Sequence, residues 1–134
     1  MNLVLDANAL VALIHNEPGG SSVADMLDDP GNSCLVHAVN LCEVYYDLAR
    51  THGEPKARQV IEDLMSGPLA VREDMDLEFW QTAGAHKARL RRVSLADCFC
   101  MSLAVRVGGD LVTADHHEFD PVQQEGICTI RFIR

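Results

Sequence analysis

Short apolar runs alternate with longer amphipathic segments along the whole chain. Apolar residues recur at helical spacing in six segments, which predicts helices over 8–14, 21–27, 41–50, 57–65, 77–90 and 94–107. Between them lie continuous runs rich in Val, Leu and Ile, which predict strands over 2–5, 33–36, 69–71, 111–113 and 127–132. Apolar strands that alternate with helices are typical of a parallel sheet covered on both faces. We therefore predict an α/β fold, a three-layer α/β/α sandwich with a short, mainly parallel five-stranded sheet.

The length and composition allow one such domain. The chain has 134 residues, of which 48% are hydrophobic, so we expect a single domain over 1–134. No apolar run reaches the roughly 18–20 residues of a membrane span, and the first segment lacks the basic residues of a signal peptide. The five cysteines form no CxxC pair. We expect a cytoplasmic protein with reduced cysteines and no membrane contact.

The formal net charge of −9 argues against a protein that coats nucleic acid, because neutralising phosphates requires a basic surface. This negative charge does not exclude an enzyme that binds phosphates through a metal cation.

Two acidic residues follow predicted strands. Asp6 ends the strand over 2–5, and Asp115 follows the strand over 111–113. The carboxyl ends of parallel strands are where such sheets build their sites. Asn8 and Thr113 stand two positions from these acids and share a face with them if the backbone is extended. Taken singly, each acid also fits a helix cap or a loop residue.

Two further acids stand near helix starts. The stretches from Asn40 to Glu43 and from Ser94 to Asp97 both match a cap residue followed three positions later by an acid. Capping alone explains either acid, since a carboxylate complements the helix dipole. Asp97 differs because apolar residues surround it and no Lys or Arg lies within the next turn. An ionised carboxylate in such a place needs a partner, and a divalent cation would provide one.

Carboxylates that converge on one pocket repel one another and stay ionised only if a metal neutralises them. Ligand sets made only of oxygen favour hard cations, Mg²⁺ or Mn²⁺, over zinc. The adjacent His116 and His117 lack any metal-ligand pattern, and we expect them to lie in a loop.

The four acidic motifs, in this order, resemble those of PIN-domain nucleases, and the length resembles the VapC-type toxin ribonucleases of toxin–antitoxin pairs. The resemblance covers the whole chain. By position, the acidic quartet of that family corresponds to Asp6, Glu43, Asp97 and Asp115. Thr113 corresponds to its hydroxyl residue, while Asn8 and Ser94 would support the acids. One departure is that three residues, His116, His117 and Glu118, separate Asp115 from Phe119, where the family commonly has two.

The resemblance implies metal-dependent hydrolysis of RNA phosphodiester bonds that leaves 5′-phosphate and 3′-hydroxyl ends. It also implies an antitoxin partner and a homodimer. We expect one or two Mg²⁺ or Mn²⁺ ions, with Asp6 and Asp97 as primary ligands and Glu43 and Asp115 nearer a second ion or outside the first ligand sphere. The basic run over 86–92 is either a solvated helix end or a phosphate-positioning segment, with Lys87, Arg89 and Arg92 as candidate RNA contacts.

Two other functions remain open. One is a catalytically silent PIN-like module that binds RNA or a protein. The other is an aspartate-nucleophile phosphatase built on Asp6, a class that usually has a second acid at the position of Asn8 and a longer chain. A phosphoacceptor receiver domain fits less well, because no lysine follows Lys87.

Overall fold

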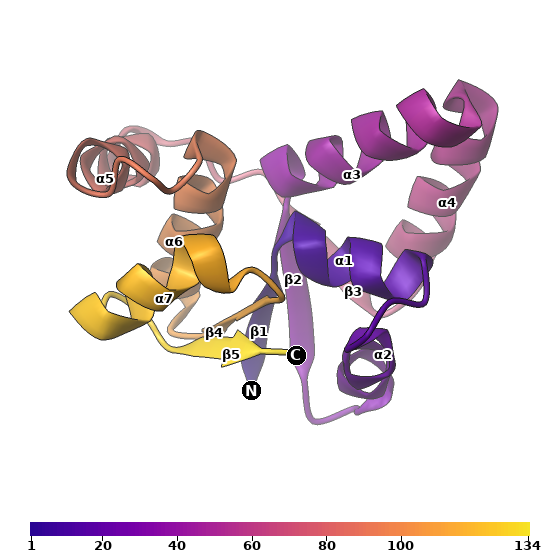
Figure 1. Ribbon diagram of the computed structural model, residues 1–134, viewed down its shortest axis with the longest axis horizontal. Helices are drawn as coiled ribbons and strands as arrows, with labels where there is room; N and C mark the ends of the chain where they lie inside the picture. The colour runs from indigo at the N-terminus through magenta and orange to yellow at the C-terminus, as the bar shows by residue number, and fades with distance from the viewer.

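The computed structural model describes residues 1–134 and alternates strands with helices from end to end (Figure 1). The elements in chain order are β1 (Asn2–Leu5), α1 (Ala7–Ile14), α2 (Gly20–Asp28), β2 (Ser33–His37), α3 (Ala38–His52), α4 (Glu54–Ser66), β3 (Leu69–Arg72), α5 (Leu77–Arg89), α6 (Leu95–Val107), β4 (Asp110–Thr113), α7 (His116–Glu125) and β5 (Ile130–Phe132). All strand pairs are parallel, and the sheet order is β3-β2-β1-β4-β5. The predicted α/β fold with a parallel sheet is confirmed.

The sheet separates two apolar cores, which makes the three layers visible in Figure 1. The central strand β1 is fully buried from Leu3 to Leu5, and its side chains alternate between the two faces. Leu3 and Leu5 join the core under α1 to α4, whereas Val4 joins the core under α5, α6 and α7. Burial on both faces explains why the strands read as continuous apolar runs rather than as alternating ones.

Three local expectations were wrong. His116 and His117 begin the helix α7 rather than lie in a loop, and the last strand is confined to β5 instead of spanning 127–132. The helix α3 begins at Ala38 with the His37 side chain as its cap, so Asn40 is not the cap residue. No helix in the structure combines the length and hydrophobicity needed to cross a membrane.

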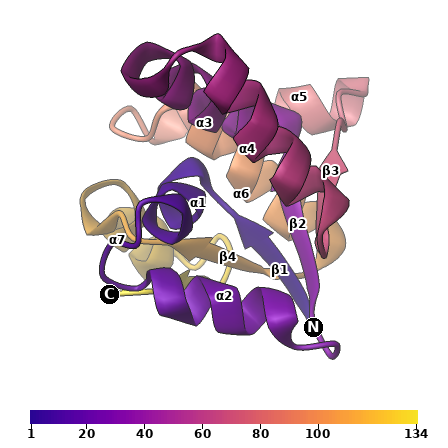
Figure 2. The ribbon, with the colours of Figure 1, turned by 90° about the vertical axis from the view of Figure 1, so that its right-hand side faces the viewer.

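Helices α1, α6 and α7 all begin near the carboxyl ends of β1 and β4. β1 runs from the N-terminus toward the start of α1 (Figure 2). β4 ends at Thr113 and leads into α7, and β1 and β4 are neighbours with Leu5 opposite Val112. Helix α6 packs against both strands. This edge of the sheet therefore collects the first turns of α1, α6 and α7.

Candidate metal centre

Asp6 is held at the junction between β1 and α1. Its backbone N–H donates to the carbonyl of Val112 at 3.1 Å, so the strand pairing continues to this residue. Its Oδ1 accepts from the backbone N–H of Ala9 at 2.8 Å, which caps α1, and its Oδ2 accepts from the Thr113 hydroxyl at 2.5 Å. The side chain is fully buried. Two hydrogen bonds thus fix the orientation of this carboxylate.

Thr113 connects Asp6 to the second acid of the same sheet edge. The Thr113 Oγ1 that donates to Asp6 also accepts from the backbone N–H of Asp115 at 3.0 Å. Asp115 in turn caps α7, since its Oδ1 accepts from the backbone N–H of Glu118 at 3.0 Å. One hydroxyl therefore sets the relative position of two carboxylates, and α7 adds a third acid, Glu118.

The side chain of Asp97, in the first turn of α6, lies at the same edge of the sheet as Asp6 and Asp115. Ser94 Oγ accepts from the backbone N–H of Asp97 at 3.2 Å, so Ser94 is the side chain that caps the helix. The Asp97 carboxyl is only 7% exposed. One carboxyl oxygen from each of Asp97, Asp115 and Glu118 lies within 4.8 Å of the other two. We call these three residues the acid cluster.

Glu43 lies half-buried in the second turn of α3. The start of α3 is tied to α6 because Asn40 Nδ2 donates to the carbonyl of Ala96 at 3.2 Å. Asn8 is exposed in the first turn of α1 and shares a surface cleft with Glu43. The chain turns into α1 directly after Asp6, so Asn8 does not lie on an extended segment beside that acid, and it forms no side-chain hydrogen bond with any of the acids.

The electrostatics of the site show that the acids repel one another. Burial, together with the neighbouring Glu118, Asp6 and Glu43 carboxyls, raises the pKa of Asp97 to about 10. Burial raises the pKa of Asp6 to about 7, against the hydrogen bonds from Thr113 and Ala9, which lower it. The pKa of Glu43 is raised by burial and by Glu118. No cationic side chain compensates any of these three groups.

These observations fit a hard divalent cation. All the converging donors are carboxyl oxygens, the ligand type that Mg²⁺ and Mn²⁺ prefer. One of them, Oε2 of Glu118, is buried without any hydrogen-bond partner. A buried acceptor of this kind is costly unless a donor or a cation satisfies it. Asp97, Asp115 and Glu118 are therefore the residues best arranged to hold an ion, with Asp6 and Glu43 adjacent.

Glu118 is the residue that sequence reasoning missed. In the sequence Glu118 stands out only as a spacer between Asp115 and Phe119, after two histidines predicted to lie in a loop. The signal that identifies it is the spacing of Asp115 and Glu118, which is that of a helix cap followed by an acid three residues later. This is the same pattern that drew attention to Asp97.

The three candidate RNA contacts of the basic run have different partners in the structure. Lys87 Nζ donates to the backbone carbonyls of Arg91 at 3.0 Å and Val93 at 2.9 Å. Arg89 forms a salt bridge of 3.4 Å with Glu125. Arg92 Nη2 lies 3.2 Å from Nδ1 of His117, in the first turn of α7. Both Arg89 and Arg92 therefore reach α7, but only Arg92 contacts its first turn, next to Glu118 of the acid cluster.

The sequence over residues 3–123 matches the family model described as PIN domain. Because this match spans most of the chain, the chain belongs to the PIN-domain family. No protein with a curated description matches the sequence significantly.

Solved structures with the same fold include chains of toxin–antitoxin complexes and a toxin. VapBC2 from Rickettsia felis, bound to a promoter DNA fragment, has a chain with TM-score 0.77 and 17% identity, covering 98% of both chains. DNA-bound VapBC from Salmonella typhimurium gives TM-score 0.75 and 18% identity, covering 100% of this chain and 99% of that one. VapC20 from Mycobacterium tuberculosis, a sarcin–ricin loop cleaving toxin, gives TM-score 0.73 and 16% identity, with coverages of 90% and 94%. At these identities the likeness establishes a shared fold.

Proposed function

We propose that this protein is an endoribonuclease dependent on Mg²⁺ or Mn²⁺, and that it is the toxin of a type II toxin–antitoxin pair. The observation that carries the proposal is the convergence of the buried Asp97 with the partly buried Asp115 and Glu118 beside Asp6, with no cationic side chain to neutralise them. Membership of the PIN-domain family supports nuclease chemistry. The similarity in fold to VapC20, a toxin that cleaves the sarcin–ricin loop, supports RNA as the substrate.

The acid cluster would hold one or two ions. When bound, such a cation neutralises charge on the phosphoryl oxygens and lowers the pKa of water. Thr113 and the Ala9 N–H hold the Asp6 carboxylate in a fixed orientation, so it loses little freedom when the site assembles. The Glu43 side chain forms no hydrogen bond and is half-buried, which leaves its carboxylate free to orient the attacking water and accept its proton.

The hydrolysis needs no covalent intermediate on the protein. Water attacks the phosphorus, the bond to the 3′ oxygen breaks, and the products carry 5′-phosphate and 3′-hydroxyl ends. An aspartate nucleophile is disfavoured because Asp6 is fully buried and both of its oxygens already accept hydrogen bonds. A silent binding module has no use for several acids that raise one another's pKa.

The proposed partners follow from the same assignment. Solved structures with this fold include toxin–antitoxin complexes, which supports a small antitoxin as the partner. We also infer a homodimer and a cytoplasmic location. Light scattering after size-exclusion chromatography measures the first, and fractionation of the source cells measures the second.

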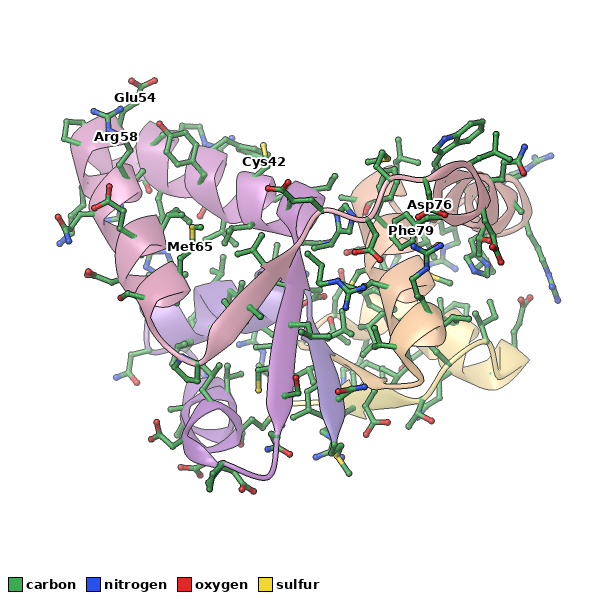
Figure 3. All side chains as sticks on the ribbon, turned by 180° about the vertical axis from the view of Figure 1, so that it is seen from behind. Cys42, Glu54, Arg58, Met65, Asp76 and Phe79 are labelled. Carbon is green, nitrogen blue, oxygen red and sulfur yellow. The ribbon has the colours of Figure 1, made fainter.

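The test is RNA cleavage by substituted proteins in Mg²⁺ or Mn²⁺. We expect Asp97→Asn and Asp6→Asn to abolish cleavage while the proteins remain folded. Glu54→Gln is the matched control, because Glu54 is also an acid in the first turn of a helix but lies on α4, away from the site (Figure 3). Retained cleavage in either aspartate variant rejects the assignment.

A further inference from the structure

Most basic side chains of this acidic protein are already neutralised. Seven of the eleven Lys and Arg residues form salt bridges, as follows: Arg50, Arg58, Arg72, Arg89, Arg106, Arg131 and Arg134. The four others are Lys56, Lys87, Arg91 and Arg92. Three of these four stand at the junction between α5 and α6. Unpaired positive charge is therefore concentrated at one place on the surface.

The turn over residues 90–94 presents two arginines from a rigid base. Leu90 and Val93 are buried in the core under α5, α6 and α7, and Val93 N–H donates to the carbonyl of Leu90 at 3.0 Å. Arg91 and Arg92 lie between these two anchors and are exposed. Because both ends of the dipeptide are fixed by burial, the two guanidinium groups point outward from a defined backbone.

A cleft of about 280 Å³ opens beside this turn. Its lining residues are Arg89, Leu90, Arg91, Arg92, Val93 and Pro121. Every charged residue in that set is an arginine. The surface of the cleft is mostly apolar, and the arginines supply its charged groups. These groups suit phosphate oxygens, because planar guanidinium groups bind them through paired hydrogen bonds.

The ammonium of Lys87 is already engaged inside the turn. It donates to the carbonyls of Arg91 and Val93 at 3.0 Å and 2.9 Å, which are the carbonyls on either side of Arg92. A charged donor to two backbone carbonyls fixes the orientation of the peptide planes between them. Lys87 is thereby a support for the arginines and has little capacity left for a ligand of its own.

The turn also lies next to the acid cluster. It leads directly into Ser94, the cap of the helix that carries Asp97. On the other side, Arg92 contacts His117, which precedes Glu118 in α7. A phosphate bound at this turn would therefore sit close to the carboxyl groups that hold the ion.

We propose that residues 87–92 form a preorganised phosphate clamp for the RNA backbone, in which Arg91 and Arg92 contact phosphates and Lys87 is a positioning residue. This inference rests on the proposed ribonuclease function. It reassigns Lys87, expected from the sequence to contact RNA, and adds Arg91, which the sequence did not single out. Arg89 is a minor contributor, because Glu125 already partners it.

The test measures binding of a single-stranded RNA at several salt concentrations, using inactive Asp97→Asn protein with Mg²⁺ so that no cleavage occurs. Each lost phosphate contact reduces the slope of log K against log salt by about 0.7, which is about 5-fold in affinity at 0.1 M salt. We expect Arg91→Gln and Arg92→Gln each to show this loss. Arg58→Gln, on the distant helix α4, serves as the control and leaves the slope unchanged (Figure 3).

Lys87→Met separates a positioning role from direct contact. If Lys87 acts through the arginines, this change weakens binding in the parent protein but has no further effect when Arg91→Gln and Arg92→Gln are both present. A further slope reduction of about 0.7 in that double variant would show that Lys87 itself contacts phosphate and would overturn its assignment. In the protein without RNA, we expect Lys87→Met to speed hydrogen exchange at the Val93 and Asp97 amides, whereas unchanged exchange would also overturn it.

The outcomes separate the clamp from the proposed function. Strong RNA binding by the parent that Arg91→Gln and Arg92→Gln leave unchanged overturns the clamp alone. A parent protein that binds no RNA at any salt concentration overturns the proposed function and the clamp with it. Loss of binding to an acidic protein partner, with RNA binding intact, shows that these arginines serve that partner and also overturns the clamp.

Discussion

Replacing Asp97 with asparagine is expected to stabilise the metal-free protein at pH 8. The Asp97 carboxyl is 7% exposed, and its pKa in the folded protein is about 10, compared with 3.8 for the unperturbed group. The folded state therefore binds a proton at pH 8 that the unfolded state has released, and this difference reduces stability as the pH rises. Asparagine is neutral in both states and removes this cost.

The size of the effect follows from the linkage between protons and folding. About four pH units separate the unperturbed pKa from pH 8, and each unit corresponds to about 1.4 kcal/mol, which sets a ceiling of about 6 kcal/mol. Water penetration and side-chain relaxation reduce the penalty of a buried charge, so we expect a gain of about 2–4 kcal/mol. If Asp97 only complemented the helix dipole, the same change would cost about 0.3–1 kcal/mol. The two accounts differ in sign.

Urea unfolding of metal-free protein at pH 8 measures this difference, with Glu54→Gln as the control acid in the first turn of α4. Adding Mn²⁺ at about 1,000 times its Kd is expected to reverse the order, since an ion at that concentration stabilises the wild-type protein by about 4.1 kcal/mol and binds the variant weakly. A loss of stability in metal-free Asp97→Asn would refute the reasoning, because it would mean that the raised pKa of the Asp97 carboxyl carries no cost in stability at pH 8.

Three further predictions concern the same site. Thr113→Val removes the hydroxyl that lowers the pKa of Asp6. Calorimetry should therefore show weaker Mn²⁺ binding at pH 7 that partly recovers at pH 8. An affinity equal to that of the wild-type protein would contradict this role of Thr113. Glu118→Gln should weaken Mn²⁺ binding at least 10-fold while preserving the fold measured by circular dichroism, and unchanged affinity would remove Glu118 from the cluster. The metal-free wild-type protein should melt at a lower temperature as the pH rises from 5 to 9. The raised pKa values of Asp6 and Asp97 in the folded state reduce stability at any pH above the unperturbed pKa of 3.8. A melting temperature that rises with pH would contradict these raised pKa values.

The parts of the site that could be predicted are those tied to the sheet. Strands that are apolar on both faces identify a parallel sheet, and a parallel sheet places Asp6 and Asp115 at the same edge. Their link through Thr113 follows from the same geometry, since β1 and β4 are neighbours with Leu5 opposite Val112. The sequence alone does not state which strands are neighbours, but the positions of the acids were correct without that knowledge.

The parts that could not be predicted depend on local competition at helix ends. Helix α7 buries only Phe119 and Val122 and contains Pro121, so its hydrophobic pattern is too weak to reveal Glu118 as a helical residue. Asn40 matches a cap by type, yet the His37 ring accepts from the Val39 N–H and caps α3 one turn earlier. Asn40 is instead buried and joins α3 to α6.

The basic run shows a similar limit. Lys87, Arg89 and Arg92 have the same charge in the sequence, but the structure directs one to backbone carbonyls, one to Glu125 and one to His117. Trp80, an aromatic residue of α5, is 45% exposed. Periodicity identified these segments as helical, but the partners of individual long side chains depend on tertiary packing.

Cleavage of RNA by the wild-type protein before and after removal of divalent cations tests the central claim most directly. We predict that EDTA abolishes cleavage, that added Mg²⁺ or Mn²⁺ restores it, and that the products carry 5′-phosphate and 3′-hydroxyl ends. Cleavage that continues at an undiminished rate in EDTA would contradict the account, because the converging carboxyl groups of Asp97, Asp115 and Glu118 would then act without the cation that we infer from their arrangement.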